Sequence, residues 1–451
     1  MKRLFGTDGV RGIANRELTA DLAYRLGYAG AKVLTGETAH KPTILVGCDT
    51  RISCAMLEAA MTAGICSAGA DVHLCGVIPT PAVAYLTKKY KYDAGVMISA
   101  SHNSFEYNGI KFFSGSGFKL PDQVEDEIEE IAQNYDAANC QNPIGDRVGS
   151  RVIRTDAAHL YAEHLKRRQS SDLSGLRIAL DCANGAASAI APDLLKDLGA
   201  TVFAVATAPN GLNINDNCGS THIENLRQIV IREGCHLGFA FDGDSDRVLP
   251  VDELGRFVDG DVIMALLARH LRAQGVLKSD TIVATVMSNL GLEIMTSREK
   301  LCLEKTKVGD RYVLEKMLEC GYNLGGEQSG HVILLDHATT GDGILTALAL
   351  LRAYIAYGGP MSEMRKVIDI LPQVLLPAHV AEDKKDQAMK DEKLLAAIRK
   401  YEESLGSEGR ILVRASGTEP VIRVMIEGKD QKEIQKMADH LVKLIVSQYA
   451  V

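Results

Sequence analysis

Residues 95–113 read GVMISASHNSFEYNGIKFF, and the interpretation of the whole chain starts from this stretch. It begins as an apolar run of strand length. It then changes abruptly to the small polar residues Ser-Ala-Ser-His-Asn, and Gly-Ile-Lys-Phe-Phe resumes an extended pattern. A buried strand that ends in a polar turn is how α/β proteins present reactive groups. The stretch therefore predicts an α/β fold with Ser101 on a functional turn.

The chemistry of this turn has two interpretations. A hydroxyl nucleophile at Ser101, followed by Lys111 where the chain becomes extended again, suits phosphoryl transfer, in which positioning and charge stabilisation provide most of the catalysis. Serine, histidine and asparagine are also ordinary turn residues, so a turn between two strands with no catalytic role explains the same residues. The stretch alone leaves both open.

The composition is that of a globular protein with several domains. The 451 residues suggest roughly three domains by length, and 46% hydrophobic with 24% charged residues is ordinary. The net charge of −8 and the lack of a basic tract make nucleic acid an unexpected partner. The ten cysteines form no Cys-x-x-Cys pair, which indicates reduced thiols in a cytosolic protein.

Neither end nor middle of the sequence contains a membrane signal. Residues 1–12, MKRLFGTDGVRG, lack the apolar core of a signal peptide, and no apolar stretch is long enough to cross a bilayer. We therefore expect a soluble, cytoplasmic protein with no membrane partner. Its oligomeric state, monomer or homodimer, stays open.

Strand and helix patterns alternate along most of the chain, which favours mostly parallel sheets with helices on their faces. A polar stretch at 139–151 interrupts the alternation, and after about residue 371 the β-α-β rhythm is lost. We expect three α/β units and a smaller α+β unit, with domains at 1–152, 153–255, 256–370 and 371–451.

Residues 242–247, DGDSDR, follow the apolar run LGFAF and place three carboxylates at alternate positions. Asp242, Asp244 and Asp246 can converge on one hard cation, and oxygen ligands favour Mg²⁺ over Zn²⁺. A solvated acidic turn explains the same pattern. An EF-hand calcium loop is disfavoured, because Arg247 stands where that loop requires glycine.

Residues 414–420, RASGTEP, with Arg423 soon after, are typical of a phosphate-binding loop. Glycine and small hydroxyl side chains let backbone N–H groups approach an anion, and two arginines supply charge-assisted contacts. A surface turn between two strands would explain the same residues.

Two further glycine-rich segments are weak signals when taken singly. In GGEQSGH (325–331), Glu327 and Ser329 can bond sugar hydroxyls, and His331 can move a proton. In GTDGVRG (6–12), Arg11 is expected in a glycine-flanked loop.

In this order, FGTDGVRG, ISASHN with NGIKFF, DGDSDR, GGEQSGH and RASGTEP closely resemble the motifs of the α-D-phosphohexomutases. The resemblance extends from Phe5 to Arg423, and within the superfamily the chain most resembles the bacterial phosphoglucosamine mutases. It implies three similar α/β domains with mixed, mostly parallel sheets and a smaller C-terminal α+β domain, arranged around a central active-site cleft. Ser104, where the family usually has proline, and Ser245, where alanine is common, are small departures.

The resemblance implies a role for each motif residue. Ser101 would carry the phosphoryl group, and its phosphate would join Asp242, Asp244 and Asp246 in binding one Mg²⁺. Arg247 would lie beside the transferring phosphate. The remaining implied roles are sugar binding by Glu327, Ser329, Gly309 and Asp310, phosphate binding by Arg414, Ser416, Gly417, Thr418 and Arg423, and acid–base chemistry by Arg11, Lys111 or His331.

The implied reaction interconverts glucosamine 6-phosphate and glucosamine 1-phosphate through phospho-Ser101 and a sugar bisphosphate, which also acts as activator. It would supply UDP-N-acetylglucosamine synthesis. A phosphoglucomutase or phosphomannomutase differs only in the sugar. A metal-dependent phosphatase with Asp242 as nucleophile, or a non-catalytic sugar-phosphate-binding regulator, would carry similar motifs. The intact Ser101, aspartates and arginines argue against the regulator.

Overall fold

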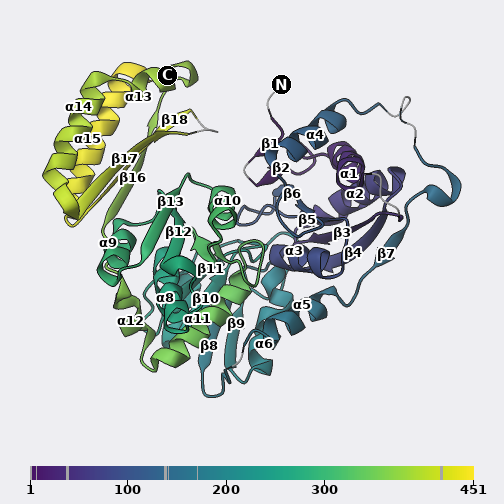
Figure 1. The fold of residues 1–451 in the computed structure, drawn as a ribbon, viewed down its shortest axis with the longest axis horizontal. Helices are drawn as coiled ribbons and strands as arrows, with labels where there is room; N and C mark the ends of the chain where they lie inside the picture. The colour runs from purple at the N-terminus through teal and green to yellow at the C-terminus, as the bar shows by residue number, and fades with distance from the viewer. Residues whose placement is uncertain are drawn as a thin grey trace. The chain divides into compact units, whose positions relative to one another are not determined.

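The computed structural model describes residues 3–6, 8–36, 40–136, 140, 142–169, 171–416 and 420–450. The chain divides into two compact units. Unit 1 comprises Met1–Met287 and Leu301–Val367, and unit 2 comprises Ser288–Lys300 and Ile368–Val451. Three of the four sheets found among the described residues belong to unit 1, and the fourth belongs to unit 2 (Figure 1).

The first sheet combines both strand directions in the order β1-β2-β6-β5-β3-β4-β7. Strands β5, β3, β4 and β7 run parallel, whereas β1, β2 and β6 pair antiparallel. The bounds are β1 Phe5–Gly6, β2 Gly9–Ile13, β3 Thr43–Cys48, β4 Asp71–Val77, β5 Ala94–Ile98, β6 Tyr107–Ser114 and β7 Arg151–Ile153.

Helices cover both faces of this sheet because its central strands are apolar on both sides. Ile44 and Val46 of β3 belong to the core beneath α1 (Ala20–Thr35), α2 (Cys54–Ser67) and α4 (Asp122–Gln133). On the opposite face, Gly47 lets Val83 of α3 (Thr80–Lys89) approach, since a Cβ at Gly47 would lie 2.7 Å from the Val83 side chain. Continuous burial of this kind is typical of parallel strands.

The second and third sheets share one pattern, in which three parallel strands end in an antiparallel edge strand. Their orders are β11-β10-β8-β9 and β13-β12-β14-β15. The bounds are β8 Arg177–Asp181, β9 Thr201–Val205, β10 Leu237–Phe241, β11 Val248–Asp252, β12 Thr281–Thr285, β13 Cys302–Thr306, β14 Leu324–Gly326 and β15 Val332–Leu334. The helices of this part are α5 Ala157–Lys166, α6 Ala191–Asp197, α7 Glu224–Arg232, α8 Gly260–Ala273, α10 Asp310–Cys320, α11 Gly343–Tyr357 and α12 Met361–Met364.

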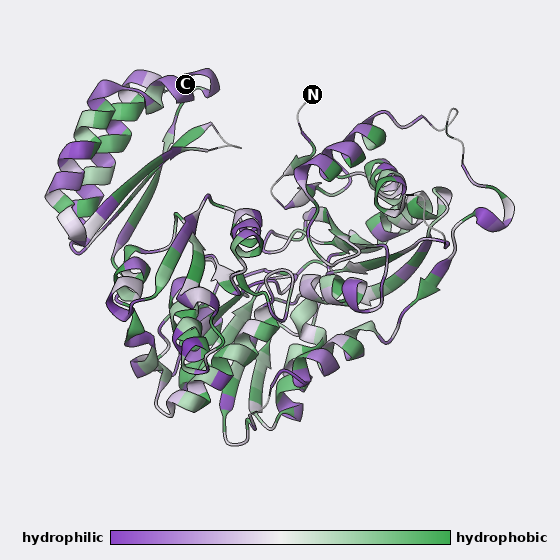
Figure 2. Cartoon of the chain, in the orientation of Figure 1, coloured by the Kyte–Doolittle hydropathy of each residue, from purple (hydrophilic) through white to green (hydrophobic). Residues whose placement is uncertain are grey.

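Unit 2 is built on a purely antiparallel sheet in the order β16-β18-β17. Its strands are β16 Gln373–His379, β17 Gly409–Ala415 and β18 Val421–Gly428, and its helices are α9 Leu290–Glu299, α13 Lys385–Met389, α14 Glu392–Leu405 and α15 Gln431–Tyr449. Helices α14 and α15 lie together on one face of the sheet (Figure 1). In α15, Ile434, Met437, Leu441 and Ile445 recur at helical spacing and are buried, and Figure 2 shows the resulting alternation of hydrophobic and hydrophilic colour.

Helix α9 joins the strands β12 and β13 of the third sheet, yet it groups with unit 2. The reason is the buried Glu427 carboxylate on β18. It accepts hydrogen bonds from Leu290 N (2.9 Å) at the start of α9 and from Arg410 Nε (2.6 Å) on β17. A buried carboxylate needs such partners, so α9 is tied to this sheet.

The predicted fold class is confirmed: three α/β sheets and a smaller α+β unit. One local expectation was wrong, because Arg11 lies on strand β2 and pairs with Gly109 of β6 instead of lying in a loop. The glycines that suggested a loop serve the close pairing, since a Cβ at Gly9 (φ 79°) would lie 2.3 Å from the Ile110 carbonyl oxygen. The domain boundaries and the central cleft stay predictions; the boundary expected at 152/153 falls inside β7.

All ten cysteines are free thiols, and Cys302 and Cys320 are exposed. Within the described part of the chain, no single helix is long and apolar enough to cross a bilayer. Helix α11 with Met361–Val367, bent by 94° at the break, has the combined length and composition.

Candidate active site

Three motif loops of unit 1 occupy equivalent positions in their sheets. Each connects a strand that has one parallel neighbour to the antiparallel strand on its other side. The serine loop (residues 99–106) joins β5 to β6, the metal loop (242–247) joins β10 to β11, and the sugar loop (327–331) joins β14 to β15. Carboxyl ends of parallel strands are where α/β proteins gather functional loops.

The serine loop places Ser101 directly against the metal loop. The Ser101 hydroxyl donates a hydrogen bond to Asp242 Oδ2 (2.5 Å), and the Ser101 N–H donates to Ser99 Oγ (2.9 Å). Ser101 is buried and has a φ of 54°, in the left-handed region that non-glycine residues seldom adopt. Such strain is typical of functional sites and requires strong local contacts to persist. The structure therefore brings together the nucleophile candidate and the predicted metal ligands.

His102, next in the chain, lies with its Nδ1 3.3 Å from Ser101 Oγ. Burial and the positive charges of Arg247 and Arg11 lower the pKa of His102 to about 4. The imidazole is therefore neutral near pH 7, and the positive charge around Ser101 comes from arginine and lysine side chains.

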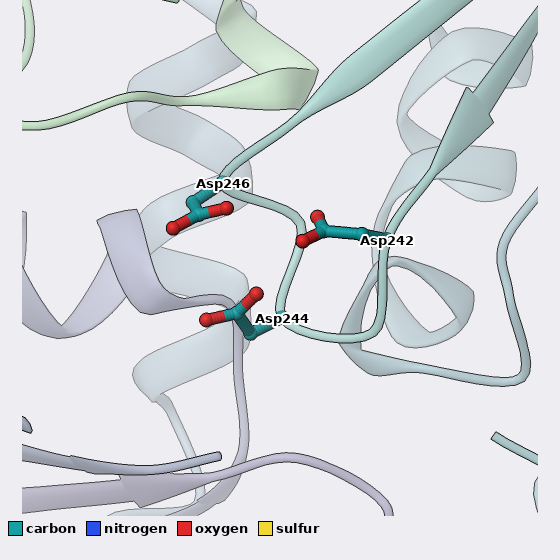
Figure 3. Close-up of side chains that lie close together, drawn as sticks. All are labelled: Asp242, Asp244 and Asp246. Atoms are coloured by element: carbon teal, nitrogen blue, oxygen red, sulfur yellow. The ribbon is translucent and has the colours of Figure 1, made fainter. Parts of the chain in front are cut away.

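The three aspartates of the metal loop form one buried cluster (Figure 3). Their carboxylates point toward one another, with ligand atoms all within 4.8 Å. Oδ1 of Asp244 and Oδ1 of Asp246 are buried and have no hydrogen-bond partner among the residues that the structure describes. Burial and the charges of Asp246 and Asp244 raise the pKa of Asp242 well above its usual range. A hard divalent cation would satisfy these oxygens and relieve the repulsion, so the donor set fits a metal site.

Lys111 lies on β6 beside this cluster. Its Nζ donates to Asp244 Oδ2 (3.0 Å) and forms an ion pair with Asp8 (3.0 Å). Burial disfavours the ammonium ion, but Asp244 and Asp8 more than offset this and raise the pKa of Lys111. Thr80 Oγ1 also donates to Asp244 Oδ2 (2.6 Å). Lys111 is therefore held as a cation.

Asp8 and Lys119 extend the charged cluster, and neither was among the predicted site residues. Lys119 Nζ donates to Asp8 Oδ1 (2.7 Å) and to the Asp310 carboxylate, while Arg11 also pairs with Asp8. Asp310 Oδ2 lies 3.5 Å from Nε2 of His331. Asp8 lies within the motif FGTDGVRG, so this motif could have identified it as a site residue. Lys119 lies in none of the five motifs, so no motif could have identified it.

The sugar loop presents buried polar atoms that make no hydrogen bond among the described residues. Ser329 Oγ and both ring nitrogens of His331 are buried, and within the described residues nothing hydrogen-bonds to them. Glu327 Oε1 accepts a hydrogen bond from Gly309 N (3.2 Å), so Gly309 lies beside the sugar loop. Gly341 lets the His331 ring pack on the backbone, because a Cβ there would lie 2.4 Å from the ring. These atoms are available to a ligand.

Arg247 closes the metal loop. Its backbone N–H donates to Asp242 Oδ1 (3.1 Å), and its Nε lies 3.8 Å from Asp246 Oδ1. Burial opposes the guanidinium charge, but Asp246 and Asp242 more than compensate and raise the pKa of Arg247 further. Arg247 is a permanent cation next to the aspartates, which suits binding of a transferring phosphate.

In unit 2, Arg414 and Arg423 face each other across β17 and β18. Like charges directly opposite one another destabilise a sheet. Burial and the charge of Arg423 lower the pKa of Arg414, whose Nε has no hydrogen-bond partner in the part of the chain that is described. Lys385 Nζ, which sequence reasoning missed, donates to the Ser416 carbonyl (2.9 Å). Arg414 and Arg423 are together suited to binding an anion. Two other residues of the predicted phosphate-binding set, Gly417 and Thr418, lie outside the described residues.

Comparison with known proteins identifies the family. Models of the phosphoglucomutase/phosphomannomutase alpha/beta/alpha domains I, II and III match residues 2–139, 159–255 and 259–369, and the model of the C-terminal domain matches 376–444. The chain belongs to the phosphoglucomutase/phosphomannomutase family. It is a phosphohexomutase, an enzyme of the isomerase class.

One relative of this phosphohexomutase is the phosphoglucosamine mutase of Ruminiclostridium cellulolyticum, 56% identical over 445 residues that cover 99% of each chain. Among solved structures, a phosphoglucomutase/phosphomannomutase family protein from Burkholderia thailandensis has a TM-score of 0.83 at 23% identity, covering 100% of this chain and 99% of that one. The N-acetylphosphoglucosamine mutase of Aspergillus fumigatus, solved with GlcNAc-6P and magnesium, has a TM-score of 0.69 at 18% identity, covering 99% and 96%. The two structures support the fold.

Proposed function

We propose that this phosphohexomutase interconverts glucosamine 6-phosphate and glucosamine 1-phosphate. The observation that most supports this proposal is the buried hydroxyl of Ser101. It is hydrogen-bonded to Asp242 at the edge of a cluster of three carboxylates. The relatives named phosphoglucosamine mutase support the choice of sugar, since they are 54–56% identical over nearly the whole chain.

The proposed reaction consists of two phosphoryl transfers through one serine. Phospho-Ser101 gives its phosphoryl group to the free hydroxyl of the sugar phosphate. The Oγ–P bond breaks and Ser101 Oγ takes up a proton, while an O–P bond to the sugar forms and the hydroxyl proton passes to a base. The resulting bisphosphate reorients in the site. Its other phosphoryl group then passes to Ser101 Oγ, which loses its proton as the sugar oxygen gains one. A sugar bisphosphate supplied from outside would phosphorylate Ser101 initially and so act as activator.

In this proposal Asp242, Asp244 and Asp246 hold one Mg²⁺, together with the phosphate of Ser101. When bound, the cation would neutralise charge on the phosphoryl oxygens. The all-oxygen donor set and the two carboxylate oxygens without partners support Mg²⁺ in preference to a softer metal.

Three side chains are candidates for proton transfer. Arginine is not deprotonated in proteins, so Arg11 is suited to binding charge. Lys111, held as a cation by Asp244 and Asp8, can donate a proton but is a poor acceptor. The two ring nitrogens of His331 have no hydrogen-bond partner in the described structure, although Asp310 Oδ2 lies 3.5 Å from Nε2, and the imidazole can accept a proton. We assign His331 as the base and Lys111 as the side chain that stabilises negative charge.

The other motif residues bind the two ends of the substrate. Arg247 contacts the transferring phosphate. Sugar hydroxyls and the amine are bound by Glu327, Ser329, Gly309 and Asp310, and the non-reacting phosphate is bound by Arg414, Ser416, Gly417, Thr418 and Arg423. We also propose that the chain divides into domains at 152/153, 255/256 and 370/371. The proposed protein is cytoplasmic, a monomer or homodimer, without nucleic-acid or membrane partners. Its product would supply UDP-N-acetylglucosamine synthesis.

The sugar preference can be measured directly. We expect a higher kcat/KM for glucosamine 1-phosphate than for glucose or mannose 1-phosphate in a panel assayed with catalytic bisphosphate. Some turnover of glucose phosphate is expected, because Glu327 can bond a hydroxyl as well as an amine. A higher kcat/KM for mannose phosphate would instead support a phosphomannomutase, and release of inorganic phosphate would indicate a phosphatase.

The arginine pair makes a second testable prediction. Hydrogen bonds to charged groups contribute roughly 1.5–3 kcal/mol, so Arg423→Ala should lower kcat/KM by roughly ten- to a hundredfold or somewhat more. The loss must be equal in both directions, because an enzyme cannot change the overall equilibrium.

Steady-state kinetics of Arg423→Ala in both directions would measure this loss. Arg399→Ala, which removes an exposed arginine from α14, is the matched control and should behave like the wild type. If Arg423→Ala keeps the wild-type kcat/KM, the segment RASGTEP is only a turn.

A further inference from the structure

The serine loop is held by a buried arginine that the reaction itself does not explain. Nη2 of Arg51 donates to the carbonyl oxygens of Ser101 (2.9 Å) and Asn103 (2.9 Å), and its Nη1 donates to the Ser104 carbonyl. The same guanidinium pairs through Nε with Asp49 Oδ2 (2.9 Å), and both side chains are completely buried. Three carbonyls of one short loop therefore converge on one fixed cation.

Asp49 reaches the loop by a second route. Asp49 Oδ2 also accepts a hydrogen bond from Ser99 Oγ (2.6 Å). Ser99 Oγ in turn accepts the hydrogen bond from the Ser101 N–H (2.9 Å). Both the N–H and the carbonyl of Ser101 are thus tied, through Ser99 and Arg51, to the end of strand β3.

Asn215 binds the same carbonyls from a different part of the chain. Its Nδ2 donates to Ser101 O (2.8 Å) and to Asn103 O (2.9 Å). Asn215 precedes β10 in sequence and is anchored to the end of β8, because its own N–H donates to Ala183 O (2.9 Å). It thereby connects the serine loop to the sheet that carries the metal loop.

The metal loop completes the enclosure of the Ser101 carbonyl. A Cβ on Gly243 would lie 2.6 Å from Ser101 O and 3.0 Å from Asn215 Nδ2, so only glycine fits there. The strained φ of Ser101 (54°) thus persists because hydrogen-bond donors and close contacts surround its backbone. None of these contacts involves Oγ, which stays directed at Asp242.

We propose that Asn215 is a positioning residue that, with Arg51, holds Ser101 Oγ in line with the metal loop and so sets the rate of phosphoryl transfer. Transfer requires near-ideal placement of the reacting atoms, and a displacement of about 1 Å can cost about a hundredfold in rate. Without Asn215, the buried Ser101 carbonyl and the part-buried Asn103 carbonyl each lose a donor, and the loop can relax from its strained conformation. The contacts assigned to the sugar and to the distal phosphate are unchanged, so kcat should fall and KM should not.

The test compares two asparagines of one segment that differ in this contact. Asn215 (φ 58°) and Asn217 (φ 49°) both have left-handed backbones, so Asn→Gly is tolerated at either position. The exposed Asn217 side chain bonds its neighbour Asp216 (2.9 Å), not the serine loop. Asn215→Asp is a third variant that leaves the shape of the side chain nearly unchanged. It replaces the donating NH₂ group with an accepting oxygen that faces the two carbonyls.

We expect Asn215→Gly to lower kcat by roughly ten- to a hundredfold, with KM within about twofold of the wild type. The single-turnover rate at which a sugar bisphosphate phosphorylates Ser101, followed by intact mass, should fall in parallel. Asn215→Asp should lose at least as much, and Asn217→Gly should match the wild type. Rates are normalised to the fraction of molecules with a wild-type melting transition, so that misfolding is not counted as lost activity.

An unchanged kcat in Asn215→Gly, a loss confined to KM, or an equal loss in Asn217→Gly would overturn the proposal. The inference rests on the proposed role of Ser101, and its failure is distinguishable from failure of that role. If Ser101 carries the phosphoryl group but Asn215 does not position it, the wild type still gains one phosphoryl group at Ser101 and Asn215→Gly gains it equally fast.

Discussion

Replacing Ser101 with alanine should abolish the mutase reaction, lowering kcat by about 10⁴-fold or more. The reason is that Ser101 Oγ is the proposed carrier in both phosphoryl transfers, and no other hydroxyl in the described structure is hydrogen-bonded to Asp242 Oδ2. Intact-mass measurement after exposure to a sugar bisphosphate should show one added phosphoryl group on the wild type and none on Ser101→Ala.

Two further variants separate chemistry from conformation. Ser101→Gly tolerates the left-handed φ of 54°, so a loss equal to that of Ser101→Ala would show that the hydroxyl matters and not loop strain. Ser104→Ala removes an exposed hydroxyl from the same loop and should keep wild-type activity. Full mutase activity in Ser101→Ala would exclude the proposed mechanism.

Asp246→Asn should produce the second large effect, weakening Mg²⁺ binding by about a hundredfold or more. The substitution keeps the shape of the side chain but removes an anionic ligand, and hard cations depend strongly on the charge of their ligands. Asp246 is a favourable site for this test because its Oδ1 has no hydrogen-bond partner in the described structure. The substitution therefore breaks no hydrogen bond to Oδ1, although Arg247, whose Nε lies 3.8 Å from this atom, loses a nearby anion.

The affinity is measured by calorimetric titration of chelator-treated protein with Mg²⁺, and independently by the Mg²⁺-induced rise in melting temperature. Binding to the folded state alone raises stability by mass action, so this rise should shrink in Asp246→Asn. Asp216→Asn, which neutralises an exposed aspartate that accepts a bond from Asn217, should titrate like the wild type. A chelated wild-type enzyme that keeps its rate without added metal would contradict the assignment.

The sequence by itself determined the fold class and the position of the motif loops. Alternating apolar strands and helices report local geometry, because side-chain burial repeats with the period of each element. The abrupt change from GVMI to SASHN therefore located the turn that carries Ser101, and LGFAF located the loop of the three aspartates. Both loops lie where expected, each between two strands of its own sheet.

Only the tertiary structure decided which distant groups hold these loops. Arg51 and Asn215 lie 50 and 114 positions from Ser101, and Lys119 lies 191 positions from Asp310. Arg11 was misplaced because its strand, β2, is held by pairing with β1 and with the distant β6. Helix α9 likewise groups with unit 2 through Glu427, 137 residues beyond Leu290. Periodicity reports neighbours within one element, whereas such contacts depend on strand order and on buried donors and acceptors finding partners across the fold.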